Sequence, residues 1–298
     1  MELAATIVMD GLIYASWLFV VALGMTLVFG VLKILNIAHG SLYAVGAYAA
    51  ASAVGLAASL GLAPGFSLLA MLLAALAVAL VLGPALERGL LRLFYGRDEV
   101  VLLLVTYALF LILEDAVKLI WGVNPYYVSE PYGLFGNATI GPLFYVGYDL
   151  ALIVLAVACG IAVWFGLNRT VAGKIVLAVI HNHEMSASMG VNVNRVHWMA
   201  FTFGVFLAAL GGAFTAPMIS VQPGISVSVI IVSFAVVIIG GLGSIEGAAI
   251  GAVIVGLARA AAVHLMPEAE LFSIYLVMAA VLIFRPEGLF RRAAARTI

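Results

Sequence analysis

The sequence predicts an all-α integral membrane protein that crosses the bilayer about nine times. Of its 298 residues, 66% are hydrophobic and 9% are charged, and the mean hydropathy is +1.25. Soluble domains carry about 25% charged residues, so lipid must be the main solvent of this chain. Apolar segments of the ~20 residues that a spanning helix needs recur along its whole length. Basic residues gather in alternate connections between them.

The first three spans are predicted before residue 87. Residues 11–32 form the first, and no Lys or Arg precedes Lys33. The basic region of a cleavable signal peptide is therefore missing, and we expect this segment to be retained as a span. Residues 34–86 contain no Asp, Glu, Lys or Arg. That length holds two spans, at 38–60 and 66–86, with a Gly- and Pro-containing turn between them.

Two further spans flank the longest loop. They are predicted at 100–121 and 147–167, and the loop at 122–146 is rich in Gly, Pro, Tyr and Asn. A charged loop over about 168–196 then leads to the sixth span at 197–218.

The last three spans are predicted at 226–241, 247–265 and 271–284. Gln-Pro-Gly precedes the seventh span, and Gly-Gly-Leu-Gly ends it. The seventh is short enough to be broken or re-entrant, which is tolerated only where protein or water covers the backbone. We expect the whole chain, 1–298, to be a single transmembrane domain.

The positive charges predict the orientation. Eleven of the thirteen Lys and Arg residues lie in one set of alternate connections, and the other set has none. The eleven are Lys33, Arg88, Arg92, Arg97, Arg169, Lys174, Arg195, Arg285, Arg291, Arg292 and Arg296. Because Lys and Arg in short loops stay cytoplasmic, the N-terminus is expected outside and the C-terminus inside. Loop 122–146 is then extracytoplasmic and loop 168–196 cytoplasmic.

Composition and motifs argue against several functional classes. A net charge of −1 does not suit a nucleic-acid partner, and the single Cys159 excludes an intramolecular disulfide or a cysteine metal cluster. No phosphate-binding G-x-x-x-x-G-K-[ST] occurs, so energy from ATP would have to come from another chain. His181 and His183 with Glu184 resemble a metal site only weakly, and we expect a solvated loop there instead. We expect no catalytic residues, no metal and no cofactor.

Polar side chains open the second span. Asn36, His39, Ser41 and Tyr43 stand among Gly and Ala residues, and small residues let helix backbones approach closely. One hypothesis is that these four residues line a substrate pathway. The alternative is a packed helix start capped by Asn36 or His39. Since residues two apart point to different sides of a helix, His39 and Ser41 are a poor catalytic pair.

Two later spans contain a basic residue. Glu114 and Asp115 lie four and three residues before Lys118, so either carboxylate can pair with the ammonium group. A functional role is the default hypothesis for intramembrane charge. Here a structural ion pair is favoured, because Lys can extend to the outer interface. Arg259 is likewise expected to reach that interface or the acidic residues at 268–270.

The cytoplasmic loop carries helix signals. Gly173 and Lys174 open one short helix, residues 184–189 form a second, and Gly190 supplies the left-handed residue that ends it. Such helices between two spans give a motor protein a surface to push on. A passive linker is the alternative.

Five groups of residues carry a family resemblance. They are Leu35-Asn36-Ile37-Ala38-His39-Gly40 with Gly46-Ala47-Tyr48; Arg169-Thr170 with Gly173; Ala187 with Gly190-Val191-Asn192; Gly240-Gly241-Leu242-Gly243-Ser244 with Gly247-Ala248 and Gly251; and Arg285-Pro286-Glu287-Gly288-Leu289-Phe290. In this order, along essentially the whole chain, they resemble the first of the two permease subunits of branched-chain amino-acid ABC importers.

The resemblance implies a multi-pass protein of the bacterial inner membrane with a second homologous permease subunit. It also implies an extracytoplasmic substrate-binding protein and two cytoplasmic ATPase subunits, which would use the ATP. The ATPases would dock on the cytoplasmic loop, and alternating access would need flexible joints. Coupling residues would be Gly173, Lys174, Glu184, Ala187 and Gly190, and candidate joints are Gly211, Gly212, Gly240, Gly241 and Gly243. Relatives usually carry a basic residue where this chain has Leu177, which leaves the details of ATPase contact open.

Two other functions stay open at this point. Related importers for urea, short amides or small carboxylic acids share these permease motifs. A stand-alone secondary transporter or channel would need charged pairs near the bilayer midplane and inverted repeats, and neither is clear in this sequence.

Overall fold

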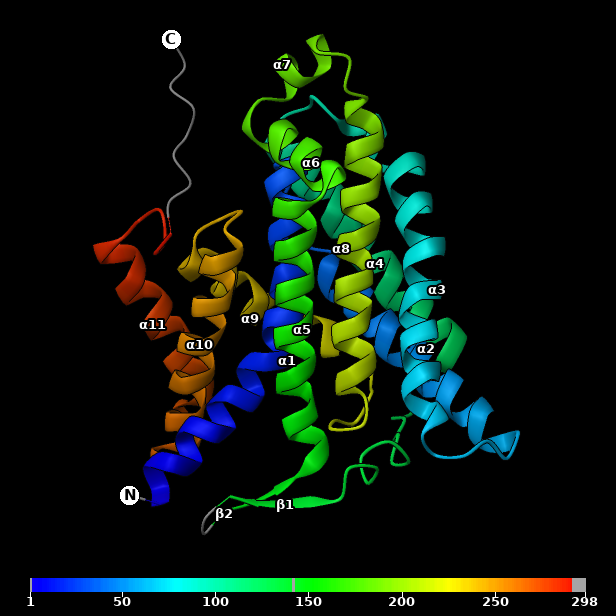
Figure 1. Ribbon diagram of the computed structural model, residues 1–298, viewed down its shortest axis with the longest axis vertical. Coiled ribbons are helices and arrows are strands. Elements are labelled where there is room, and N and C mark those ends of the chain that lie inside the picture. Colours follow the sequence, from blue (N-terminus) through cyan, green and yellow to red (C-terminus); the bar gives the residue numbers. More distant parts are fainter. Residues whose placement is uncertain (1, 141–142, 291–298) are drawn as a thin grey trace.

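A computed structural model describes residues 2–140 and 143–290, and most of them are helical (Figure 1). Among the described residues, eight helices are long and apolar enough to cross a membrane. They are α1 (Glu2–Leu32), α2 (His39–Ser59), α3 (Phe66–Gly89) with the 3₁₀ turn η1 (Leu91–Phe94), α4 (Glu99–Trp121), α5 (Gly147–Arg169), α8 (Val193–Thr215), α10 (Ile245–Leu265), and α11 (Glu270–Phe284) with η2 (Pro267–Ala269). The expected all-α multi-pass fold is confirmed.

Each of the nine predicted segments is a helix. The seventh, α9 (Ile225–Gly240), has 16 residues and is shorter than the other eight spans, as its sequence predicted. The predicted start of the first span was wrong, because α1 begins at Glu2 rather than near residue 11. The length of an apolar run indicates how much of the chain crosses the hydrocarbon layer. A helix, by contrast, continues into the polar layer wherever its residues favour it.

Helices α1, α2 and α8 form the centre of the bundle, because they are the most buried of the spanning helices. α1 packs on α8 and α10, while α2 and α3 both pack on α8. Small residues allow this approach: a Cβ added to Gly46 of α2 would lie 2.4 Å from the Cα of Ala209 in α8. Helices α5 and α11 lie at the periphery, with most of their surface outside the bundle.

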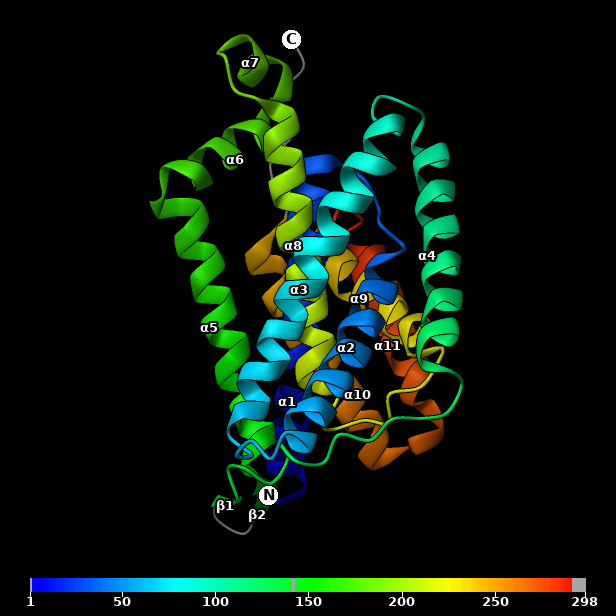
Figure 2. The same cartoon turned by 90° about the vertical axis from the view of Figure 1, so that its right-hand side faces the viewer.

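The connections separate to two ends of the molecule (Figures 1 and 2). One end carries the short helices α6 (Val171–His181) and α7 (His183–Ser188) and the connection from α3 to α4. The other carries the N-terminus and a two-stranded antiparallel sheet, β1 (Asn137–Ile140) and β2 (Leu143–Val146). The sequence did not predict this hairpin, since only the pairing of the two strands sets it apart from a polar loop.

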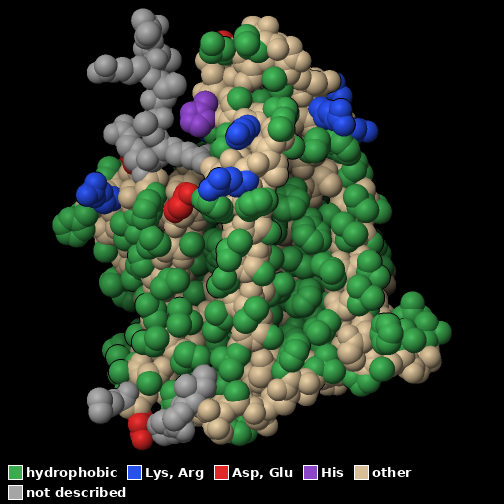
Figure 3. All heavy atoms as spheres, viewed as in Figure 1, with side chains coloured by type: hydrophobic (Ala, Val, Ile, Leu, Met, Phe, Trp, Pro, Cys, Tyr) green, Lys and Arg blue, Asp and Glu red, His purple; other side chains and the backbone are tan. Residues whose placement is uncertain are grey.

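The charged side chains follow the same division. In Figure 3, Lys and Arg gather toward the α7 end, above a broad hydrophobic band. The three most C-terminal basic residues of the predicted cytoplasmic set, Arg291, Arg292 and Arg296, lie outside the described residues. The α7 end is thus the predicted cytoplasmic end.

Candidate functional site

The predicted pathway residues lie at a break between α1 and α2. After α1 ends at Leu32, Lys33 has a positive φ of 57°, and the chain is not helical again until His39. The Nε2 of His39 lies 3.0 Å from the carbonyl oxygen of Val21. Val21 precedes the end of α1 by three turns, so α2 starts about 16 Å below that end. The chain therefore turns back into the bundle as an irregular segment, residues 33–38.

One side chain of α4 bonds to this irregular backbone. The Oγ1 of Thr106 accepts a hydrogen bond from the Ile37 amide at 3.4 Å and donates one to the Leu35 carbonyl at 3.2 Å. Thr106 is fully buried. A backbone without helical hydrogen bonds is tolerated at membrane depth only where protein or water covers it, and Thr106 contributes to that cover. Sequence reasoning missed Thr106, because a lone Thr inside an apolar span gives no local signal.

The four predicted pathway residues differ in what they do here. Ser41 donates to the Phe110 carbonyl of α4 at 3.2 Å, and the Tyr43 hydroxyl bonds Thr215 of α8. His39 contacts the Val21 carbonyl of α1, so three of the four residues bridge α2 to other helices. The predicted cap is wrong: the residue before α2 is Ala38, and no side chain caps the helix.

Asn36 is the exception. It is 1% exposed, yet its Oδ1 and Nδ2 have no hydrogen-bond partner among the described residues. His39 Nδ1 and Thr26 Oγ1 are also buried without partners. A Cβ added to Gly24 would lie 3.1 Å from the His39 ring, so the imidazole lies within a turn of Thr26 along α1. Because buried polar groups are normally hydrogen-bonded, these atoms mark a place for water or a polar solute.

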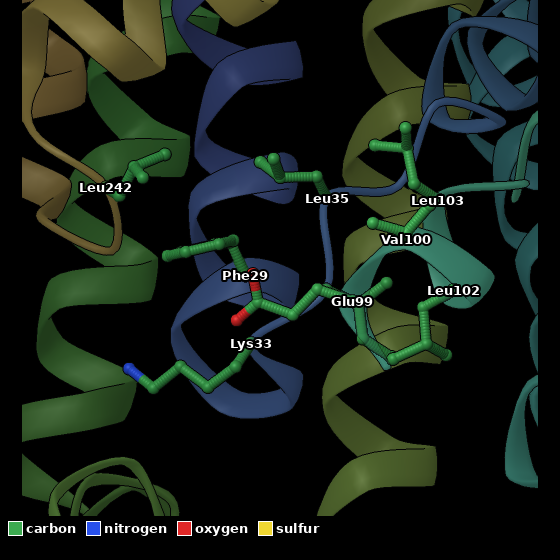
Figure 4. A pocket seen from close by; sticks show the side chains of 9 residues that line it. Phe29, Lys33, Leu35, Glu99, Val100, Leu102, Leu103 and Leu242 are labelled. Atoms are coloured by element: carbon green, nitrogen blue, oxygen red, sulfur yellow. The ribbon is translucent and has the colours of Figure 1, made fainter. Parts of the chain in front are cut away.

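A cavity of about 470 Å³ opens beside the break (Figure 4). Its lining includes Leu35, which directly precedes Asn36, and Leu242 from the turn between α9 and α10. The remaining lining residues are Phe29, Lys33, Ile34, Glu99, Val100, Leu102 and Leu103. Apart from Lys33 and Glu99 these side chains are apolar, so the cavity suits a small aliphatic group.

Glu114 of α4 lies beside the first turns of α2 and α9. Ser226, in the first turn of α9, donates its hydroxyl hydrogen bond to the Oε1 of the buried Glu114. A Cβ added to Gly40 would lie 2.5 Å from the Ser226 carbonyl oxygen, so α2, α4 and α9 meet here. Glu114 therefore joins interior helices, a role that the sequence did not distinguish from that of Asp115.

The two predicted intramembrane ion pairs are present. Lys118 pairs with Asp115 at 3.0 Å, in an exposed position. Arg259 pairs with Glu270 and lies 4.1 Å from the ring centroid of Tyr14.

The two short helices predicted in loop 168–196 are also present, and they begin at Val171 and His183 rather than at residues 173 and 184. The Oγ1 of Thr170 caps α6 by accepting from the Gly173 amide at 3.0 Å, and the Oδ1 of Asn182 caps α7 through Met185 at 2.9 Å. Gly190 has a φ of +87°, and the Val191 amide donates to Ser186 at 3.0 Å. These features form the glycine-terminated helix end that the sequence predicted.

Helix α7 offers an accessible surface. Glu184 and Ala187 are exposed, and so are the apolar side chains of Met185 at 65% and Met189 at 78%. Lys174 is exposed on α6, whereas Gly173 is buried: its added Cβ would lie 2.0 Å from the Gly166 carbonyl oxygen. Of the five predicted coupling residues, Gly173 thus positions α6 against α5, and the others lie at the surface or end a helix.

The five glycines predicted as joints lie in two places, within α8 and at the turn between α9 and α10. Helix α8 is continuous through Gly211 and Gly212, and a Cβ on Gly212 would lie 2.0 Å from the Tyr43 carbonyl oxygen. Gly241 and Gly243 have positive φ angles in the turn between α9 and α10, and Gly240 packs on the backbone of α10. In this conformation all five glycines permit close packing or a turn, and their role as joints stays a prediction.

Comparison with known proteins decides the family. The family model described as the permease component of branched-chain amino-acid transport systems matches residues 7–284. The chain belongs to this family.

Relatives align with this permease along nearly its full length. It is 28% identical over 297 residues to the high-affinity branched-chain amino-acid transport system permease protein BraD of Pseudomonas aeruginosa, covering 95% of this chain and 94% of BraD. It is 24% identical over 291 residues to LivH of Escherichia coli strain K12, with 95% and 94% covered. A solved structure, PsaBC from Streptococcus pneumoniae in complex with Fab, covers 92% of this permease and 89% of the matched chain at 12% identity and a TM-score of 0.48.

Proposed function

We propose that this permease translocates branched-chain or other small amino acids as one subunit of an ATP-driven importer. The observation that carries the proposal is the family match over residues 7–284. Relatives named as branched-chain amino-acid permeases support the substrate class. In this proposal, ATP binding and hydrolysis belong to two partner subunits, and the chain is not itself an enzyme.

The break between α1 and α2 supports a pathway through this region. Its apolar cavity of about 470 Å³ suits an aliphatic side chain, and the unpartnered amide of Asn36 suits the polar end of an amino acid. Rearrangement of residues 33–38 would need no helix to unfold, because the segment is already irregular. We propose that substrate contacts these residues in the state open to the cytoplasm.

The α6–α7 loop supports coupling to a motor. It stands at the predicted cytoplasmic end and exposes Met185 and Met189 beside Glu184. Exposed apolar patches rimmed by polar residues mark protein interfaces, and in our proposal Met185 and Met189 belong to such a patch. In our proposal the ATPases press on this loop and move α5 and α8, which it joins. A second permease subunit and an extracytoplasmic binding protein complete the importer in the inner membrane.

Reconstitution tests the proposal. The complex would be purified from its native membrane through a tag on this chain and placed in liposomes with the co-purified binding protein. We expect a second permease and ATPases to co-purify, and leucine uptake to require ATP. Urea, acetamide and small carboxylic acids serve as competing substrates, and their preferential uptake would contradict the amino-acid assignment. Uptake by this chain alone, driven by an ion gradient, would contradict the importer assignment.

A further inference from the structure

A second hollow lies where α3 ends and α8 begins, at the end of the molecule that carries α7. Its volume is about 550 Å³, and three arginines line it: Arg88 in the last turn of α3, Arg92 in η1, and Arg195 in the first turn of α8. None of the three forms an ion pair with a described Asp or Glu. The proposed pathway uses none of these residues.

The hollow carries a net positive charge. The single acidic residue in its lining, Glu87, is 1% exposed and accepts a hydrogen bond from the Tyr95 hydroxyl at 3.0 Å. The guanidinium of Arg88 lies 4.4 Å from the ring centroid of Trp198, and this cation–π contact holds it beside the hollow. Three guanidinium groups against one carboxylate leave a site suited to an anion, and guanidinium forks match phosphate oxygens in particular.

An apolar stripe continues from the hollow along α3. Leu73, Leu80 and Val81 are 52%, 60% and 66% exposed. Val81 lies seven residues before Arg88, two helical turns away on the same face, at a rise of about 10 Å. Figure 3 shows Lys and Arg side chains at the upper right, near the end of α3, with hydrophobic side chains below them. A ligand that bears an anionic group above an apolar chain would match both parts.

We propose that this hollow binds the headgroup phosphate of an anionic phospholipid, whose acyl chains lie along the exposed face of α3. The predicted orientation places the hollow in the cytoplasmic leaflet, where juxtamembrane basic clusters attract anionic lipids. An acidic protein segment would satisfy the arginines alone, whereas a phospholipid with its phosphate in the hollow would also pack its acyl chains on α3. The lipid accounts for both features.

Lipid retention measured by native mass spectrometry tests this site. The importer complex would be released from detergent micelles in the presence of phosphatidylglycerol or phosphatidylcholine. We expect the wild type to retain phosphatidylglycerol preferentially. The double variant with Arg88→Gln and Arg195→Gln should retain less of it, by about fivefold for each arginine replaced. Arg97→Gln is the matched control, because Arg97 belongs to the same connection but does not line the hollow. It should leave retention unchanged.

Two further variants separate lipid from other sources of negative charge. Val81→Asn keeps every arginine but makes the stripe on α3 polar, so it should also reduce phosphatidylglycerol retention. Inorganic phosphate should not displace the lipid. Arg88→Lys with Arg195→Lys keeps the charge and should retain most of the preference, which would show that the effect of glutamine is not loss of fold.

Several outcomes would overturn the proposal. They are equal retention of both lipids by the wild type, retention by the double glutamine variant equal to that of the wild type, and an unchanged result with Val81→Asn. Loss of the ATPases from the double glutamine variant, without a change in bound lipid, would assign the hollow to an acidic segment of a partner protein instead.

Discussion

Single side chains support the irregular backbone inside this bundle. Only the ends of segment 33–38 share in helical hydrogen bonds, Lys33 with α1 and Ala38 with α2, and Thr106 bonds two backbone groups between them from the neighbouring α4. An amide or carbonyl left unpaired in a buried site costs about 1–3 kcal/mol. A hydroxyl contributed by another helix therefore affects both stability and the position of the break.

Replacing Thr106 should destabilise the protein through this contact. In Thr106→Val the hydroxyl is lost while the shape is kept, and we expect the free energy of unfolding to fall by about 1–3 kcal/mol. Denaturant titration in detergent measures this change. The matched control is Thr6→Val, whose exposed hydroxyl bonds only the Glu2 carbonyl within α1. Equal unfolding free energies for the two variants would contradict the assigned role of Thr106.

Replacing the neighbouring carboxylates Glu114 and Asp115 should have different effects on stability. Glu114→Ala leaves Ser226 without its buried partner, so we expect a loss of about 1–3 kcal/mol in unfolding free energy and reduced uptake. Asp115→Ala breaks only the exposed pair with Lys118, which is worth less than about 1 kcal/mol. Denaturant titration of both variants, followed by uptake assays, makes the comparison. A larger effect from Asp115→Ala would refute it.

At the scale of helices, two kinds of glycine have different physical roles. Gly46 permits α2 to approach α8, because its added Cβ would lie 2.4 Å from Ala209. Gly190 instead ends α7 through a positive φ angle, and nothing lies within 4 Å of an added Cβ. The first is required by packing and the second by backbone conformation.

Packing predicts the outcome at Gly46. Gly46→Leu must push α2 away from α8, and overpacking of this kind costs about 1–3 kcal/mol or more. We expect a lower melting temperature and a lower yield of folded protein in detergent. Gly55→Leu is a matched control in the same helix, since nothing lies within 4 Å of an added Cβ there. The packing argument fails if both variants melt alike.

Coupling predicts a different outcome at Gly190. A bulky residue in Gly190→Val strains the end of α7 by about 1–2 kcal/mol without a clash, so the complex should assemble while uptake is abolished. Gly96→Val introduces the same strain in another loop at the same end, where φ is +81° and space is also open. It should retain uptake. Normal uptake by Gly190→Val would defeat the assignment of α7 as a coupling helix.

Across the whole molecule, most of the described basic residues lie at one end and the β1–β2 hairpin lies at the other. Short loops that are rich in Lys and Arg stay on the cytoplasmic side of the membrane. The predicted orientation, with the N-terminus outside, therefore places residue 127 on the extracytoplasmic side and residue 189 on the cytoplasmic side. Both positions are exposed, Tyr127 at 76% and Met189 at 78%.

Cysteine labelling tests this orientation. In a Cys159→Ser background, Tyr127→Cys should react with an impermeant maleimide on intact spheroplasts, while Met189→Cys should react only after the membrane is opened. Val205→Cys, at a position that is 1% exposed, controls for labelling of the buried interior. The reverse pattern at positions 127 and 189 would invert the orientation.

The sequence by itself determined the helical spans, the division of charge between connections, and the presence of α6 and α7 with the glycine that follows the second. These features depend on residues close together in the chain: apolar runs of about 20 residues, and the local hydrogen bonds of Thr170, Asn182 and Gly190. The sequence also showed that polar side chains gather within residues 36–43. Its motifs indicated the family that the comparison confirmed.

Only the tertiary structure decided what those polar residues contact. Three contacts join different helices: α2 begins beside Val21 of α1, Thr106 of α4 bonds the irregular segment, and Glu114 of α4 accepts from Ser226 of α9. Apolar patterning shows that a helix is buried in lipid or protein but not which neighbour it meets. Helix partners are selected by close packing and by hydrogen bonds between residues far apart in the chain, so they appear only when the whole bundle is assembled.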